Sequence, residues 1–112
     1  MVSQDSLNFS KGEEFEKAIL QTIDSVLKKV LGGGAANVII IYAKKSVPSK
    51  WEEDPERVKV FVEALRNLIG ISSKIVELMI LKNLYSTFDL NFEEKKNYDF
   101  FDYIKELRKR QT

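Results

Sequence analysis

Apolar residues recur at intervals of three and four along most of the chain, which is the spacing that places them on one face of an α-helix. Residues 71–88 differ because they are apolar almost all round the predicted helix. Between residues 75 and 85 three side chains are polar, and they point in three different directions: Glu77, Lys82 and Asn83. A helix of this kind must be covered on most sides by other elements. We therefore expect residues 71–88 to form the central helix of the core.

An amphipathic helix is predicted before it, starting at Ser10. The spacing of Ser10 and Glu13 is that of a capping box, and Gly32 is a natural helix stop. The apolar positions between them share one face: Phe15, Ile19, Thr22, Ile23, Val26, Leu27 and Val30. Residues 1–9 are expected to be a flexible N-terminal tail, so that residues 10–112 form a single helical domain.

Two further amphipathic helices are predicted. One starts with Asp54 as cap and Pro55 at the first helical position, and it ends at Gly70. Its apolar face comprises Val58, Phe61, Val62, Leu65, Leu68 and Ile69. The other runs from about Tyr98, with Asn97 as a candidate cap, after a loop held by Leu90 and Phe92. Its apolar face comprises Phe100, Phe101, Ile104 and Leu107.

The segment 38–42 is ambiguous. Its β-branched and aromatic residues are typical of a buried strand, but no second strand is evident to pair with it. As a helix, it would carry Val38, Ile41, Tyr42 and Lys45 on one side and Ile39 and Ile40 on the other. We favour the helix, with a strand as the alternative. The predicted fold is all-α, a compact bundle of about five helices around residues 71–88.

The glycine run Gly32–Gly34 is predicted to be a helix stop and hinge. A P-loop would need the pattern GxxxxGK followed by Ser or Thr, and here Ala35 follows Gly34. A dinucleotide fingerprint would need a preceding strand, where we predict a helix. Neither phosphate-binding motif is therefore expected.

The composition argues against most catalytic chemistry. The chain has no cysteine and no histidine, which removes thiolate nucleophiles, the commonest general base and the commonest metal ligand. We therefore expect no enzyme, no cofactor and no metal site. The net charge of +1 gives no global field toward nucleic acid or membranes. No apolar run is long enough to span a bilayer and no signal peptide is evident, so a cytoplasmic location is expected.

Four runs of the chain occur in the order of an archaeal helical domain: Phe15–Leu27, Ile39–Val47, Phe61–Gly70 and Ser73–Phe88. This order resembles the Nitrosopumilus output domain family, in which a Phe-x-Glu-Ala-Leu helix ending in glycine precedes an apolar helix with one early glutamate. The matching residues are Phe61, Glu63, Ala64, Leu65, Gly70, Glu77, Leu84 and Tyr85. The resemblance implies a small helical output or interaction module, supports the helix at 39–47, and carries over no catalytic residue.

The leading hypothesis is a non-enzymatic protein-interaction or regulatory module that binds another protein or forms a homodimer. Its basis is a surplus of apolar side chains beyond what one small core can cover. The expected interaction surface comprises Ile39, Ile40, Trp51, Tyr98 and Phe101.

Two alternatives stay open. A nucleic-acid-binding regulator would use the basic end of the last helix, Lys105, Arg108, Lys109 and Arg110, although basic residues also stabilise a helix C-terminus. A small-ligand-binding domain would use a cavity near Glu77, the one early charge of the apolar helix, and the buried-charge candidate. The simpler interpretation of Glu77 is that it faces solvent or pairs locally with Lys74.

Overall fold

The computed structural model describes residues 11–47 and 56–110, and the secondary structure of these ranges is helical, with no strand. The elements are α2 (Lys11–Leu31), α3 (Gly33–Lys45), α4 (Arg57–Ile69), the 3₁₀ turn η2 (Gly70–Ser72), α5 (Ser73–Thr87) and α6 (Phe100–Arg110). The all-α prediction is confirmed, and the segment 38–42 belongs to a helix. None of these helices is long and apolar enough to cross a membrane. The predicted tail, the caps at Ser10 and Asp54, and Trp51 lie outside the described residues.

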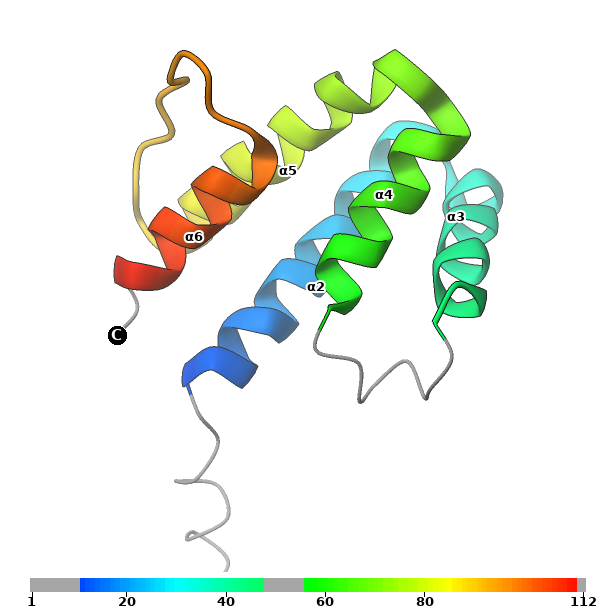
Figure 1. The fold of residues 1–112 in the computed structure, drawn as a ribbon, viewed down its shortest axis with the longest axis horizontal. Helices are drawn as coiled ribbons and strands as arrows, with labels where there is room; N and C mark the ends of the chain where they lie inside the picture. Colours follow the sequence, from blue (N-terminus) through cyan, green and yellow to red (C-terminus); the bar gives the residue numbers. More distant parts are fainter. Residues whose placement is uncertain (1–10, 48–55, 111–112) are drawn as a thin grey trace, which may run out of the picture.

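Helix α2 runs through the middle of the bundle and packs against α3, α4 and α5 (Figure 1). Its buried face is close to the predicted one and comprises Phe15, Ile19, Ile23, Val26 and Leu27. Val30 was expected on this face but is 38% exposed, whereas the next residue, Leu31, packs against the core. The helix ends at Gly32, whose positive φ of 87° favours a residue without a Cβ.

Helix α3 begins directly after Gly32, so the glycine run is not a loop. Gly33 and Gly34 form the first turn of α3, and only Gly32 separates it from α2. The buried residues follow a helical spacing: Ala36, Ile39 and Ala43. The small alanines on either side of Ile39 let α3 approach its neighbours closely. Both α2 and α4 contact α3, and Figure 1 shows it at the edge of the molecule.

A sharp corner at Gly70 joins α4 to α5, and α4 ends at this glycine, as the sequence predicted. Gly70 has a φ of 62° and ends α4, and η2 turns the chain directly into α5. The buried face of α4 comprises Val58, Phe61, Val62, Ala64 and Leu65. Leu68 was predicted on this face but is exposed at the corner.

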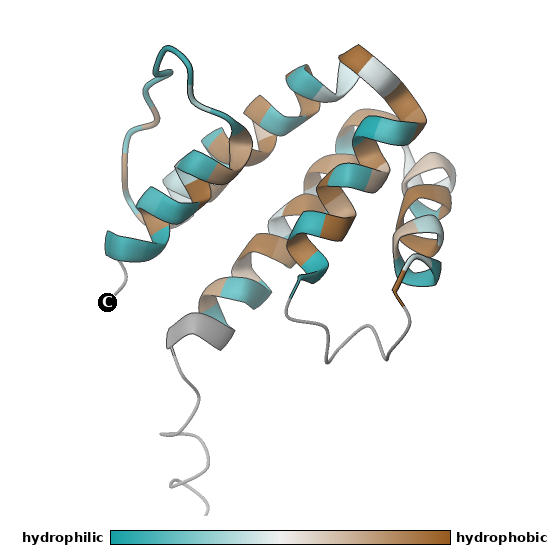
Figure 2. Ribbon diagram, viewed as in Figure 1, coloured by the Kyte–Doolittle hydropathy of each residue, from teal (hydrophilic) through white to brown (hydrophobic). Residues whose placement is uncertain are grey.

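Helix α5 is covered on one side, not all round. Its buried residues are Ser73, Val76, Glu77, Ile80, Leu81, Leu84 and Tyr85. By contrast, Ile71 in η2 is 84% exposed and Ile75 in the first turn of α5 is also exposed. The corner at Gly70 carries these residues to the periphery, where Figure 2 shows apolar ribbon at the edge of the bundle. The prediction that other elements surround this helix on most sides is therefore wrong for the start of α5.

Helix α6 starts at Phe100, two residues later than predicted, and it packs against α5. The backbone N–H of Asp99 donates to the Asp102 carboxylate at 2.8 Å, as in the glutamate arm of a capping box. Asn97 is not the cap, since its φ of 66° places it in a left-handed turn before the helix. The core side of α6 comprises Phe100, Tyr103, Ile104 and Leu107.

Candidate functional site

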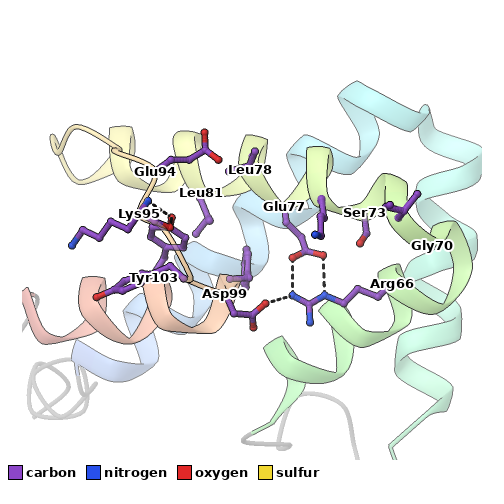
Figure 3. Close-up of a pocket in the computed structure, with 14 residues that line it drawn as sticks. Arg66, Gly70, Ser73, Glu77, Leu78, Leu81, Glu94, Lys95, Asp99 and Tyr103 are labelled. Carbon is purple, nitrogen blue, oxygen red and sulfur yellow. Dashed lines mark hydrogen bonds and ion pairs between the residues drawn. The ribbon is translucent and has the colours of Figure 1, made fainter.

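A pocket of about 530 Å³ lies where the α4–α5 corner, the loop 88–99 and α6 meet (Figure 3). Leu78 and Leu81 of α5 form part of its wall, and Tyr98 and Tyr103 contribute aromatic surface. Glu77 also lines the pocket, and a cavity near this residue was one of the alternatives that the sequence suggested. The pocket therefore combines an apolar wall with charged groups, with Arg66 and Glu77 toward one end and Glu94 and Lys95 toward the other (Figure 3).

Arg66 makes the hydrogen bonds that hold one end of the pocket together. Its Nε and Nη2 donate to the two carboxylate oxygens of Glu77 at 2.9 and 2.8 Å, and Nη2 also donates to Asp99 at 2.8 Å. Figure 3 shows Arg66 reaching between the two acids, which come from α5 and from the residue before α6. Its guanidinium carbon lies 5.5 Å from the Phe101 ring centroid. The hydrogen bonds to Glu77 raise the pKa of Arg66, so it stays charged.

Glu77 is buried at 6% exposure, and its partner is not the one expected from the sequence. The local pairing with Lys74 is wrong: Glu77 faces α4 and binds Arg66, which lies eleven residues earlier in the chain. Two-point hydrogen bonding is the geometry that a guanidinium and a carboxylate favour. With both oxygens held by Arg66, Glu77 is poorly placed for proton transfer to a substrate. Sequence spacing carries no signal for this pair, because the sharp corner brings the two helices together.

Tyr103 fastens the loop 88–99 to α6. Its hydroxyl accepts a hydrogen bond from the Lys95 backbone N–H at 2.7 Å and donates to the Lys95 carbonyl oxygen at 3.2 Å. The hydroxyl of Tyr85 donates to the Tyr103 carbonyl oxygen at 3.3 Å. The Phe92 ring packs against both tyrosine rings, with centroids 5.3 Å from Tyr85 and 5.0 Å from Tyr103. Phe92 thus holds the loop down, as the sequence predicted.

Glu106 of α6 binds the side chains of two residues of the loop 88–99. Its carboxylate accepts from Lys95 Nζ at 2.7 Å and from the Tyr98 hydroxyl at 2.6 Å. These two hydrogen bonds lower the pKa of Glu106, and the same bonds raise the pKa values of Lys95 and Tyr98. Tyr98 also packs edge-on against the Tyr103 ring, with centroids 4.9 Å apart. Tyr98, expected on an interaction surface, therefore has a structural role although part of it is exposed.

One of the basic residues at the end of α6, Arg108, contacts another helix of the same chain. Arg108 lies 3.6 Å from Glu16 of α2, and its guanidinium carbon is 5.4 Å from the Phe15 ring centroid. Burial raises the pKa of Glu16, and Arg57 and Arg108 oppose this shift. Arg108 therefore helps to attach α6 to α2, while Lys105, Lys109 and Arg110 are exposed. Within the described residues, no group of three acidic side chains could hold a metal ion.

The exposed side of α3 is the opposite of the one expected. Ile39 is only 3% exposed and Ile40 is half-buried against the core, whereas Val38, Ile41 and Tyr42 are 60%, 52% and 42% exposed. Phe101 is also half-buried, beneath Arg66. The helical pattern grouped Val38, Ile41 and Tyr42 correctly but left open which side faces out. Lys45 was grouped with them and is exposed, and its charge is the signal in the sequence that marks this side as the outer one.

Comparison with family models, with curated proteins and with solved structures finds no match to this chain. The likeness to the Nitrosopumilus output domain family therefore stays a prediction from the residues.

Proposed function

We propose that this chain is a non-enzymatic protein-interaction module whose contact surface is the α3 outer face, defined by Val38, Ile41 and Tyr42. The observation that carries the proposal is the exposure of these three large apolar side chains on a regular helix. Ile41 and Tyr42 lie three and four residues after Val38, and this spacing places all three side chains as a stripe on one face of the helix. Helices with such a stripe dock into apolar grooves of other proteins through residues at these intervals.

Single exposed apolar residues are common on monomeric proteins, and they need no partner. The α3 outer face differs because its residues adjoin one another on an element fixed by buried neighbours. Ile39 and Ala43 anchor the opposite side of α3 in the core, so the stripe is held in one orientation. A preorganised surface of this kind loses little conformational entropy on binding. The output-module role implied by the family resemblance is consistent with it.

The proposal is tested by comparing the proteins that the full chain retains from an extract of its source organism. Ile41→Ser removes half-exposed apolar surface, and Ile71→Ser is the matched control because Ile71 is an exposed isoleucine on another element. We expect a set of retained proteins that is lost on Ile41→Ser and kept on Ile71→Ser. An identical set for the wild type and Ile41→Ser would contradict the proposal.

A second candidate function is the binding of a small polar molecule in the pocket beside Arg66 and Glu77. The supporting observation is its volume of about 530 Å³, which lies within the range of small-molecule sites. Lys74 and Glu94 line it and make no ion pair with other described residues. The test is the change in Tm with a panel of amino acids and short peptides. We expect a ligand-dependent rise that Leu78→Trp abolishes by filling the pocket, and no rise with any compound would contradict it.

A further inference from the structure

We infer that the occupant of the α3 outer face is an acidic amphipathic helix of another protein. The inference rests on the proposed function and adds the chemistry of the partner. It starts from the charges on α3: along residues 33–45 the charged side chains are Lys44 and Lys45, and both are exposed. The apolar stripe therefore ends at two cations, with no acid on the same helix to neutralise them.

The other end of the stripe has a different shape. Gly34 precedes Val38 by four residues and Ile41 by seven, so it lies on the same face of α3. A Cβ built on Gly34 meets no atom within 4 Å, and the same holds for Gly33. This end presents bare backbone to its surroundings, which allows another helix to approach closely. The two ends of the surface therefore differ. The start at Gly34 has no side chain and no charge, and the end at Lys45 is basic.

A partner helix that matches this surface has three features in order. It carries a large apolar side chain over Gly34, apolar residues against Val38 and Ile41, and carboxylates beside Lys44 and Lys45. From Gly34 to Lys45 the face spans about three helical turns, or roughly 16 Å at 1.5 Å per residue. A short amphipathic helix with glutamates beside one end of its stripe is therefore sufficient.

A second copy of the chain fits the surface poorly. In a parallel pairing of two α3 helices, Lys44 and Lys45 would face their own counterparts. In an antiparallel pairing, they would face the start of the other α3, where free N–H groups give a partial positive charge and no acid is present. Like charges brought together at an interface disfavour the wrong partner. Pairing of two α3 outer faces with each other is therefore opposed in both orientations.

An anionic membrane surface also fits less well than an acidic helix. Each lysine near such a surface adds only a modest electrostatic attraction, and α3 offers two. Stable attachment usually needs a longer basic cluster or a lipid anchor as well. An acidic helix, by contrast, gains from the apolar stripe and from both lysines at defined positions.

The inference is tested by selecting binders to the full chain from a displayed library of helical peptides. Each peptide carries a fixed stripe of leucine and isoleucine, and the positions flanking one end vary among glutamate, glutamine and lysine. We expect glutamate to be enriched about tenfold over lysine among the binders, the ratio that two modest ion pairs produce. On the charge-reversed chain, Lys44→Glu with Lys45→Glu, the enrichment is expected to reverse.

Two substitutions separate the inference from the proposed function. Binding is expected to be lost on Ile41→Ser and kept on Ile71→Ser, and circular dichroism of both variants verifies that they are folded. Binders that need Ile41 but show no preference for glutamate would overturn the acidic partner and leave the proposed function standing. Binders unaffected by Ile41→Ser, or no binders at all, would overturn both.

A second copy of the chain and a membrane surface are the two other candidate occupants of the α3 outer face. Each has its own measurement, and a positive result in either would overturn the inference. A dimer in sedimentation equilibrium that Ile41→Ser abolishes would identify a second copy as the occupant. Binding to phosphatidylserine–phosphatidylcholine vesicles that Ile41→Ser abolishes would identify a membrane surface.

Discussion

Arg66 of α4 and Glu77 of α5 form a two-point ion pair across the Gly70 corner, with N–O distances of 2.9 and 2.8 Å. Glu77 is nearly inaccessible, while the Arg66 side chain is 36% exposed. The pair therefore links α4 to α5 next to the corner. Arg66 also binds Asp99, the residue before α6. One side chain thus connects three parts of the fold.

Removing Arg66 is expected to destabilise the fold more than removing both partners. Arg66→Met leaves the buried carboxylate of Glu77 without its donors, at a cost of about 2 to 4 kcal/mol in the free energy of unfolding. Arg66→Met combined with Glu77→Met is expected to cost less than Arg66→Met alone, because no buried charge remains unpaired. Urea unfolding at pH 7 measures both values. A double variant less stable than the single one would contradict this role.

Tyr103→Phe is expected to loosen the loop 88–99 without unfolding the bundle. The change removes the hydroxyl that binds the Lys95 backbone N–H and carbonyl group, at a cost of about 1 to 2 kcal/mol. Hydrogen exchange at the Lys95 amide should accelerate strongly, because its acceptor is gone. Tyr98→Phe is the control, since the Tyr98 hydroxyl binds only the exposed Glu106 side chain among the described residues. Equal exchange at Lys95 in both variants would contradict the assignment.

Glu106 is expected to make stability fall on the acid side. Its pKa is lowered in the folded protein by hydrogen bonds from Lys95 and Tyr98, so the folded state favours the charged form. This contribution is complete above the ordinary value of 4.5 and is lost as the pH falls through 4.5 toward the lower folded pKa. Glu106→Gln should therefore reduce the loss of stability between pH 6 and pH 3.5. Unfolding midpoints at both pH values test this, and an unchanged loss in Glu106→Gln would argue against it.

The helical register of α3 is tested by two isoleucines that are two residues apart. In a strand, Ile39 and Ile41 would share a face, whereas in α3 one is buried and the other is exposed. Ile39→Ala is expected to cost about 2 to 4 kcal/mol, and Ile41→Ala less than about 0.5 kcal/mol. Chemical denaturation gives both numbers. Similar losses at the two positions would contradict the register.

Periodicity predicted α2, α4, α5 and α6, whereas α3 was favoured as a helix because no second strand was evident. It placed Phe15, Ile19 and Leu27 in the core and located both glycine stops, because capping and amphipathic spacing are local properties. It did not decide which side of α3 faces out, since both sides are apolar between residues 38 and 42 and Lys45 is the one charged residue that marks the exposed side. For α5 too, apolar residues on all sides did not show which of them are buried, and the number of sides covered by other helices was overestimated.

The candidate site was less predictable than the fold. Glu77 was identified as a notable charge, but its partner was not, because Arg66 becomes its neighbour only through the turn at Gly70. Arg108 was grouped with a basic tail, although it lies against Phe15 and Glu16 of the first described helix. Both contacts join residues that are distant in sequence, and spacing along the chain carries no information about them.

The most direct measurement of the central claim is photo-crosslinking from the α3 outer face in cells of the source organism. A photoreactive residue replaces Val38, which is 60% exposed, and in a control chain it replaces the exposed Lys82 of α5. We expect a discrete covalent adduct with another protein from position 38 and none from position 82. No adduct from position 38, or the same adducts from both positions, would contradict the claim that α3 carries the contact surface.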